Sequence, residues 1–262
     1  MIAERFVLNE ARNVSLTAYI QETGGTYRKL KERPGILVIP GGGYHHVSRR
    51  EGDPVAARFL EEGYQVMILQ YSVGEHAAWP HPLEDYEQAM ELIGEHAAEW
   101  HLNMSRFAVI GFSAGGHLAA VAATMAKHRP AAAILGYALL TDEVKRCLDA
   151  PSPAEHVTPE CCPCFLFASR TDPSVSVKNT LAFTNALEDA GVIYETHIYN
   201  HGPHGFSTGA GQVQDRSVMC RRAFRWSDDA VTWLEDVLGG MNDGEMTPGI
   251  VDQIAMPAPD RQ

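Results

Sequence analysis

The sequence predicts an α/β fold in which a mostly parallel, doubly wound sheet has helices packed on both faces. Three observations point to it. Short apolar runs alternate with helical patterns along the chain, as they do in successive βα units. The run Ile36-Leu37-Val38-Ile39 is continuously apolar, which is typical of a strand buried on both faces. The length of 262 residues is enough for one domain with a large core.

The first elements are predicted to be antiparallel strands. Residues 5–8 form one, and residues 14–21 form a second, because apolar and polar side chains alternate there as in a half-buried strand. Gly24-Gly25 and Pro34-Gly35 predict turns. The buried strand 36–39 follows the second of these turns.

The later elements are predicted from helical spacing of apolar residues and from short apolar runs. Apolar residues at helical spacing or in short runs predict helices at 53–62, 83–99, 114–127, 177–190 and 223–238, and strands at 64–70, 107–110, 131–137, 164–168 and 193–199. Prolines interrupt residues 140–160, which predicts a short helix and a loop over the site. We therefore expect a single domain over residues 1–240 and a C-terminal tail over 241–262 with little periodicity.

Charge and hydropathy exclude several classes of partner. The formal net charge is −12, which disfavours nucleic acid and anionic membranes. The first twenty residues lack the apolar stretch of a signal peptide, and no apolar run is long enough to span a bilayer. These features predict a cytoplasmic protein, although a chain from which a leader had been removed would look the same. A homodimer is compatible with the sequence, which leaves the oligomeric state open.

The five cysteines do not suggest a disulfide framework, because their number is odd. Cys161, Cys162 and Cys164 invite a metal or redox interpretation. They run directly into an apolar strand, however, and we favour small side chains entering that strand. No histidine motif argues for a metal, so neither a metal nor a cofactor is expected.

The motif Gly111-Phe112-Ser113-Ala114-Gly115 indicates a nucleophile elbow. It follows a predicted strand and precedes an alanine-rich helix, which is the context in which Gly-x-Ser-x-Gly places a serine on a strained turn. Small residues are needed because strand and helix nearly touch there. A plain glycine-containing loop is the alternative.

Three consecutive glycines follow the buried strand 36–39, in the sequence Pro40-Gly41-Gly42-Gly43-Tyr44. Such a loop can point backbone N–H groups at the oxyanion of a tetrahedral intermediate. A phosphate loop is a weaker alternative, because the Gly-Lys-Ser/Thr ending is missing. A bare flexible turn is the other.

A serine nucleophile needs a histidine base and an orienting carboxylate. Asp172 follows the second strand after the elbow, where the acid is expected, although it could instead cap the turn before Pro173. Asp142 and Glu143, after the preceding strand, are the rival carboxylates. His204 and His201 share the loop after the last strand. We favour His204, which is further from the strand end and can turn back over the elbow.

These residues resemble α/β-hydrolase esterases of the acetyl-xylan and carbohydrate esterase type, which are related to the hormone-sensitive-lipase-like group. The similarity runs from about Pro34 to Phe206. It includes the glycine loop with the segment after it, the helix before the elbow, the elbow, the loop with Asp172, and the loop Gly202-Pro203-His204-Gly205-Phe206. Pro40, Pro173 and Ser176 depart from the family pattern.

The resemblance implies hydrolysis of small acyl esters, often acetyl groups on sugars. It implies Ser113 as nucleophile, His204 as base and Asp172 as the residue that orients it, with the N–H groups of Gly42, Gly43 and Ala114 as the oxyanion hole. Loops at the carboxyl ends of strands bind ligands in α/β sheets. We therefore expect three aromatic residues in or beside such loops to line the substrate pocket: Tyr44, Trp79 and Phe206.

The sequence thus predicts a serine esterase whose partner is a small acyl ester. Two other functions stay open. A peptidase or amidase would use the same triad, although peptidases of this fold usually have a large extra domain for which residues 1–240 leave no room. A small-molecule sensor on a hydrolase fold would not need Ser113, Asp172 and His204 together.

Overall fold

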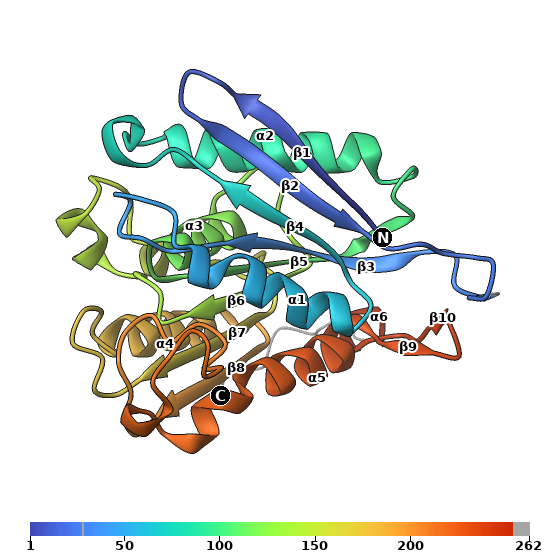
Figure 1. Ribbon diagram of the computed structural model, residues 1–262. Helices are drawn as coiled ribbons and strands as arrows, with labels where there is room; N and C mark the ends of the chain where they lie inside the picture. Colours follow the sequence, from blue (N-terminus) through green and yellow to red (C-terminus); the bar gives the residue numbers. More distant parts are fainter. Residues whose placement is uncertain (28, 254–262) are drawn as a thin grey trace.

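The structure is a computed structural model that describes residues 1–27 and 29–253. Its main sheet has eight strands in the order β1-β2-β4-β3-β5-β6-β7-β8 (Figure 1). The strands are β1 (Ile2–Asn9), β2 (Val14–Ile20), β3 (Arg33–Ile39), β4 (Gln65–Gln70), β5 (Leu102–Phe112), β6 (Ala132–Gly136), β7 (Cys164–Ser169) and β8 (Tyr194–Tyr199). In this sheet β2 pairs antiparallel with both β1 and β4. The other pairs, β4-β3, β3-β5, β5-β6, β6-β7 and β7-β8, are parallel. The predicted fold class is confirmed.

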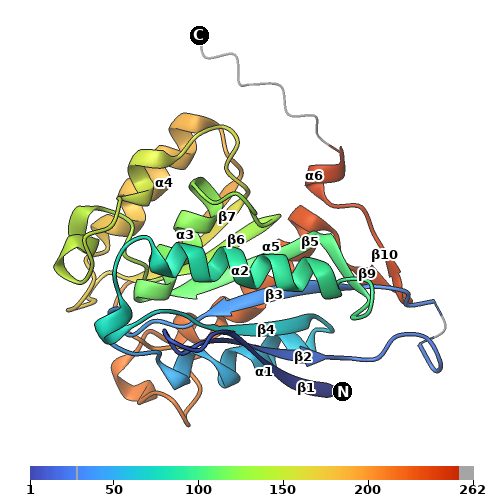
Figure 2. The ribbon, with the colours of Figure 1, turned by 90° about the horizontal axis from the view of Figure 1, so that it is seen from above.

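Helices cover both faces of this sheet (Figures 1 and 2). The helices are α1 (Asp53–Glu61), α2 (His81–His96), α3 (Ser113–Thr124), α4 (Lys178–Ala190), α5 (Trp226–Leu238) and α6 (Ile250–Gln253). Short 3-10 helices lie at Arg49–Glu51, Gly74–His76, Asp142–Arg146, Pro153–His156, Arg216–Val218 and Arg221–Arg225. Apolar residues of α2, α3 and α4 form the core on one face, and those of α1 and α5 form the core on the other. The alternation of strand and helical patterns in the sequence reflects these two layers.

One predicted turn is wrong. Pro34 and Gly35 lie inside β3 rather than before it. The pairing of β3 with β5 shifts register between Arg33 and Gly35, so the missing N–H of Pro34 falls at this irregularity. A Cβ on Gly35 would lie 2.4 Å from Leu102 Cδ1 and 2.6 Å from Phe107 Cδ2. The glycine is needed for close packing in the sheet, not for a turn.

Residues 241–253 are more ordered than the sequence predicts. The strands β9 (Met241–Asn242) and β10 (Glu245–Met246) form a small hairpin, and α6 follows it. Asp252 on α6 forms an ion pair with Arg106 at 3.2 Å. Residues 254–262 of the predicted tail lie outside the described residues. Within residues 140–160, two short 3-10 helices lie at Asp142–Arg146 and Pro153–His156.

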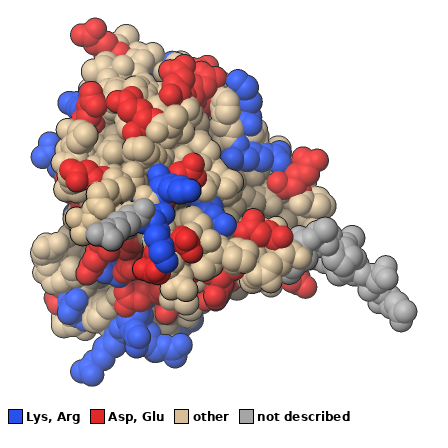
Figure 3. Space-filling view, turned by 90° about the vertical axis from the view of Figure 1, so that its right-hand side faces the viewer, with Lys and Arg blue, Asp and Glu red and all other residues tan. Residues whose placement is uncertain are grey.

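Acidic and basic side chains are mixed on the face of the molecule that carries the amino ends of the parallel strands. Figure 3 shows Asp and Glu spread over this face among Lys and Arg, rather than one continuous basic surface.

Across residues 1–27 and 29–253, none of the helices has both the length and the apolar character needed to cross a membrane. The opposite edge, on the left in Figure 1, carries the carboxyl ends of the parallel strands and the loops that form the site.

Candidate active site

Ser113 lies at the sharp turn between β5 and α3. Its φ of 54° is in the left-handed region, which is strained for a residue with a side chain. A Cβ on Gly111 would lie 2.2 Å from the carbonyl oxygen of Gly115, and a Cβ on Gly115 would lie 2.1 Å from that of Ile39. Both glycines are therefore required by the close approach of strand and helix, as the sequence pattern predicts.

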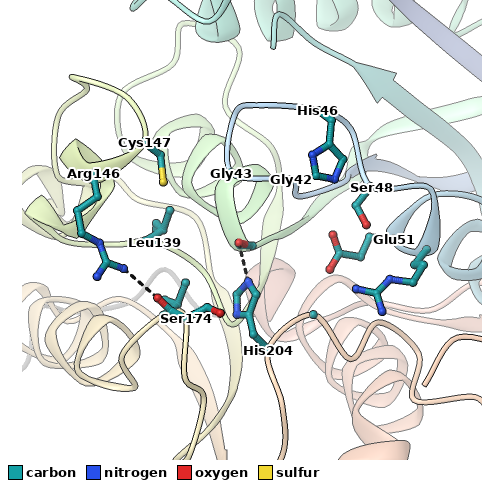
Figure 4. A pocket seen from close by; sticks show the side chains of 14 residues that line it. Gly42, Gly43, His46, Ser48, Glu51, Leu139, Arg146, Cys147, Ser174 and His204 are labelled. Carbon is teal, nitrogen blue, oxygen red and sulfur yellow. Dashed lines mark hydrogen bonds between the residues drawn. The ribbon is translucent and has the colours of Figure 1, made fainter. Parts of the chain in front are cut away.

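Three residues from separate loops meet at this turn. His204 Nε2 is 2.9 Å from Ser113 Oγ, and His204 Nδ1 is 2.7 Å from Asp172 Oδ2. Figure 4 shows the imidazole of His204 pointing at the elbow, with the hydrogen bond drawn as a dashed line. The arrangement has the order of contacts that a serine nucleophile, its base and an orienting carboxylate require.

The loop after β7 fixes the carboxylate of Asp172. Its side chain is 1% exposed, and Oδ1 accepts hydrogen bonds from the N–H groups of Ser174 at 2.8 Å and Val175 at 3.0 Å. With Oδ1 held by the backbone, Oδ2 is left to accept the Nδ1–H of His204. Asp172 therefore has both roles that the sequence suggests. Its Oδ1 caps the turn before Val175, and its Oδ2 contacts His204.

The rival residues lie elsewhere. His201 is exposed, and its Nδ1 is 2.8 Å from Asn200 Oδ1. Asp142 is exposed and pairs with Lys145 at 2.8 Å. Glu143 pairs with Arg146 at 2.5 Å and accepts a hydrogen bond from Asn179. The structure brings His204 and Asp172 to Ser113 and leaves these alternatives outside the site.

The glycine loop lies directly beside Ser113. Gly42 has a φ of 130°, and a Cβ there would lie 1.9 Å from the carbonyl oxygen of His46, so only glycine fits. Among the described residues, the N–H groups of Gly42 and Gly43 donate no hydrogen bond to the protein, and both residues line the pocket. Ala114 follows Ser113 at the N-terminus of α3, where backbone N–H groups lack partners within the helix.

A pocket of about 310 Å³ opens at this point (Figure 4). Its lining combines polar and apolar groups around Ser113 and His204. It comprises Gly42, Gly43, His46, Ser48, Arg50, Glu51, Ser113, Leu139, Arg146, Cys147, Ser174, Val175, His204 and Gly205. Arg146 and Cys147 come from residues 140–160, so part of that segment does lie over the site.

The predicted aromatic lining is corrected. Tyr44 and Phe206 are each 1% exposed, and a side chain enclosed in the core cannot contact a ligand. Trp79 is half-buried, with its ring 6.2 Å from that of His117, and it does not line the pocket either. Each of the three follows a strand end or adjoins a catalytic loop, but its side chain turns into the apolar layers.

Tyr44 instead holds a buried histidine. Its hydroxyl is 2.6 Å from His117 Nδ1, and His117 Nε2 is 2.9 Å from the carbonyl oxygen of Pro151. Because that carbonyl can only accept, Nε2 carries the proton and Nδ1 accepts from the tyrosine. Burial lowers the pKa of His117 to about 4, so the imidazole is neutral at physiological pH.

The cysteines of the 161–164 segment are free thiols that enter β7. Cys161, Cys162 and Cys164 are buried, and burial raises the pKa of the Cys161 thiol. The Cys164 thiol donates to the carbonyl oxygen of Cys162. An interaction with the Cys162 thiol, and then burial, raise the pKa of the Cys164 thiol. In the part of the chain that the structure describes, no group of His, Cys, Asp and Glu is arranged to hold a metal ion.

Comparison with solved structures identifies close relatives of the whole domain. An α/β-hydrolase enzyme from a Medee basin deep-sea metagenome library superposes with a TM-score of 0.85, at 35% identity over 90% of this chain and 97% of that chain. An acetyl ester-xyloside bifunctional hydrolase from Caldicellulosiruptor lactoaceticus superposes with a TM-score of 0.74, at 28% identity over 85% of this chain and 88% of that chain.

Sequence comparison points in the same direction. A family profile designated BD-FAE matches residues 26–129, which include the glycine loop and the elbow. Endo-1,4-β-xylanase B from Butyrivibrio fibrisolvens is 28% identical over 67% of this chain, and an acetylxylan esterase from Xylanibacter ruminicola is 27% identical over 69%. The chain spans only 33% and 43% of these two relatives, respectively.

Proposed function

Because the chain belongs to the α/β-hydrolase family, we propose that it is a serine carboxylesterase that hydrolyses small acyl esters. The observation that carries the proposal is the continuous set of contacts from Ser113 through His204 to Asp172. The esterases among the relatives support the reaction type. No metal or cofactor takes part in the proposed reaction.

The proposed reaction proceeds through an acyl-enzyme. Ser113 Oγ attacks the ester carbonyl carbon while His204 Nε2 accepts the hydroxyl proton, and Asp172 stabilises the imidazolium through Nδ1–H. The C–O bond to the alcohol then breaks, and His204 returns its proton to that oxygen. Water attacks the acyl-enzyme with His204 again as base, which releases the acid and restores Ser113.

The oxyanion of each tetrahedral intermediate would be held by backbone donors. The N–H groups of Gly42 and Gly43 are unused within the described protein, and that of Ala114 lies at the N-terminus of α3. Donors that are aimed before the reaction begins stabilise developing charge without reorganisation, and the loss of one such donor costs about 10²–10³ in kcat in a well-studied case.

Acetyl esters of sugars are the proposed substrates. A volume of about 310 Å³ is at the small end for ligand pockets, and the aliphatic part of the lining is limited to Leu139 and Val175. Apart from Cys147, the other side chains of the lining carry polar groups, and these can bind hydroxyl groups of the alcohol. The acetylxylan esterase and the acetyl ester-xyloside hydrolase among the relatives also support this choice.

A substrate panel tests the proposal. We expect turnover of p-nitrophenyl acetate to exceed that of the butyrate and to fall steeply to the octanoate, and we expect acetate release from acetylated xylo-oligosaccharides. Faster turnover of octanoyl than of acetyl esters would contradict the small acyl pocket. Preference for peptide p-nitroanilides over every ester would indicate a peptidase or amidase instead.

A further inference from the structure

Glu51 places a buried carboxylate between the glycine loop and the sheet. The residue is 3% exposed. Its Oε2 accepts the N–H of Gly41 at 2.8 Å, and its Oε1 accepts the hydroxyl of Tyr137 at 2.7 Å. Figure 4 shows Glu51 beside the glycine loop, on the side of the pocket away from Arg146 and Ser174. Burying a carboxylate is costly unless it is hydrogen-bonded, so these two contacts are what keep it there.

Tyr137 joins this carboxylate to the loop that carries His204. It lies at the end of β6, and its hydroxyl oxygen accepts the N–H of Ser207 at 3.0 Å. Its ring meets that of His204 edge-on, with centroids 5.1 Å apart. The Ser207 hydroxyl donates to the Arg50 carbonyl oxygen, and the Ser207 carbonyl oxygen accepts the indole N–H of Trp226 at 2.8 Å. The backbone just after His204 is therefore held on three sides.

The protonation state of Tyr137 determines which groups donate and which accept in this series of hydrogen bonds. Burial, and then the nearby Glu51 carboxylate, raise the pKa of the Tyr137 phenol well above its ordinary value. The phenol therefore keeps its proton and donates it to Glu51, while its oxygen accepts from Ser207. The resulting order runs from Ser207 N–H to Tyr137 to Glu51, which also receives the N–H of Gly41.

Gly41 has little freedom to move without disturbing the nucleophile. A Cβ on it would lie 2.7 Å from the Phe112 carbonyl oxygen and 3.0 Å from Ser113 Cβ. A shift of Gly41 would carry the amides of Gly42 and Gly43 with it. A misplacement of about 1 Å in a catalytic group can cost about 10²-fold in rate, so the anchor on Gly41 N–H bears directly on the oxyanion donors.

We propose that Glu51 is a positioning residue for the oxyanion loop, and that with Tyr137 it couples this loop to the loop of His204. The proposal rests on the proposed esterase function. Glu51 borders the pocket, but Gly41 and Tyr137 occupy its two carboxylate oxygens, so it acts through these two residues. The buried pair of Glu51 and Tyr137 thus holds both the backbone donors for the oxyanion and the loop that carries His204.

The variants Glu51→Gln and Tyr137→Phe test this proposal, with the exposed Glu91→Gln as control. Glutamine has the same size, but its amide has one acceptor oxygen where the carboxylate has two, so it cannot accept from both Gly41 and Tyr137 in this geometry. We expect Glu51→Gln to lower kcat for p-nitrophenyl acetate about 10- to 100-fold with KM within about twofold. Affinity for a trifluoromethyl ketone should fall by the same factor, because the oxyanion of its serine adduct needs the same donors.

A double-mutant cycle tests the coupling. Tyr137→Phe keeps the ring but removes the hydroxyl, and we expect its loss of kcat and that of Glu51→Gln to be strongly non-additive in the double variant. Additive losses would overturn the coupling. An unchanged kcat and ketone affinity in Glu51→Gln, or a loss confined to KM, would overturn the positioning role. If Glu51→Gln does not fold, Tyr137→Phe tests the same unit by the same ketone measurement.

Failure of this inference is distinguishable from failure of the proposed function. Wild-type protein should hydrolyse p-nitrophenyl acetate and be labelled by a fluorophosphonate on Ser113. If it does neither, the esterase proposal fails and this inference with it. If it does both and Glu51→Gln behaves like wild type and Glu91→Gln, only the inference fails.

Discussion

His204 Nε2 lies 2.9 Å from Ser113 Oγ, although 91 residues separate them along the chain. The contact exists because β5 and β8 end at the same edge of the sheet, with β6 and β7 between them. The loop after β7 supplies Asp172 to the same imidazole. The order of parallel strands thus places three loops in reach of one another, and each side chain in the contact can be tested separately.

Ser113→Ala should abolish hydrolysis while the protein stays folded. Alanine tolerates the turn about as well as serine does, but it has no oxygen to attack the ester. We expect kcat to fall by about 10⁴–10⁶, measured with p-nitrophenyl acetate. A fluorophosphonate should label Ser113 in the wild-type protein, as mapped by mass spectrometry, and labelling that persists in the alanine variant would refute the assignment.

His204→Ala should remove the general base, and His201→Ala serves as the matched control. Only a neutral imidazole at this position can accept the proton of Ser113. The His204 variant should lose about 10⁴–10⁶ in kcat. His201 is exposed and away from Ser113, so its variant should keep a near wild-type rate.

Asp172→Asn should cost about 10⁴ in kcat, because an amide in place of the carboxylate favours the wrong imidazole tautomer. Asp142→Asn is the control, since Asp142 is exposed and forms an ion pair with Lys145 rather than a contact with His204. Both rates are measured with p-nitrophenyl acetate at one pH. An active Asp172→Asn together with an inactive Asp142→Asn would show that Asp142, not Asp172, orients the histidine.

Gly115→Ala and Gly94→Ala should change stability in opposite directions. A Cβ on Gly115 would lie 2.1 Å from the Ile39 carbonyl oxygen and 2.3 Å from that of Pro40, so we expect destabilisation on the order of 3–5 kcal/mol or failure to fold. A Cβ on Gly94, exposed in α2, meets nothing within 4 Å. Alanine there should stabilise the helix by about 0.5–1 kcal/mol. Urea unfolding measures both, and a stable Gly115→Ala would contradict the tight elbow.

His117 should make stability fall with acidity. Its pKa is lowered from 6.5 to about 4 by burial, so between these values the unfolded chain binds a proton that the folded protein does not. Stability from this residue is complete above about pH 6.5, declines as the pH falls to about 4, and is constant below, a loss of up to about 3 kcal/mol.

The control for this prediction is His117→Gln, which can still donate to the Pro151 carbonyl oxygen but does not titrate. Urea unfolding of both proteins at pH 7, 6, 5 and 4 separates His117 from the carboxylates, which titrate equally in each. Parallel stability curves for the two proteins would show that the buried imidazole contributes no pH dependence.

Local patterns in the sequence predict most of the fold and the reacting groups. The run Ile36–Ile39 and the alanine-rich helix after Ser113 could be assigned from their apolar periodicity, because buried strands and helices impose it. Ser113 and Asp172 could be named as candidate catalytic residues because short turns of defined chemistry follow strand ends. The prediction of a turn at Pro34-Gly35 was wrong, because proline and glycine also occur where a strand begins irregularly or packs closely.

The surroundings of the reacting groups were decided by the tertiary structure. Tyr44 and Phe206 follow the right strands, yet the direction of a side chain depends on φ and ψ at one residue and on the layer that encloses it. Nothing in the segment after the glycine loop indicates that Glu51 is buried, because its partners Gly41 and Tyr137 come from other strand ends. Sequence alone determined which groups could react, since their chemistry is local. Only the folded chain decided what lines the pocket and what holds the groups in place, since packing joins residues that are distant in sequence.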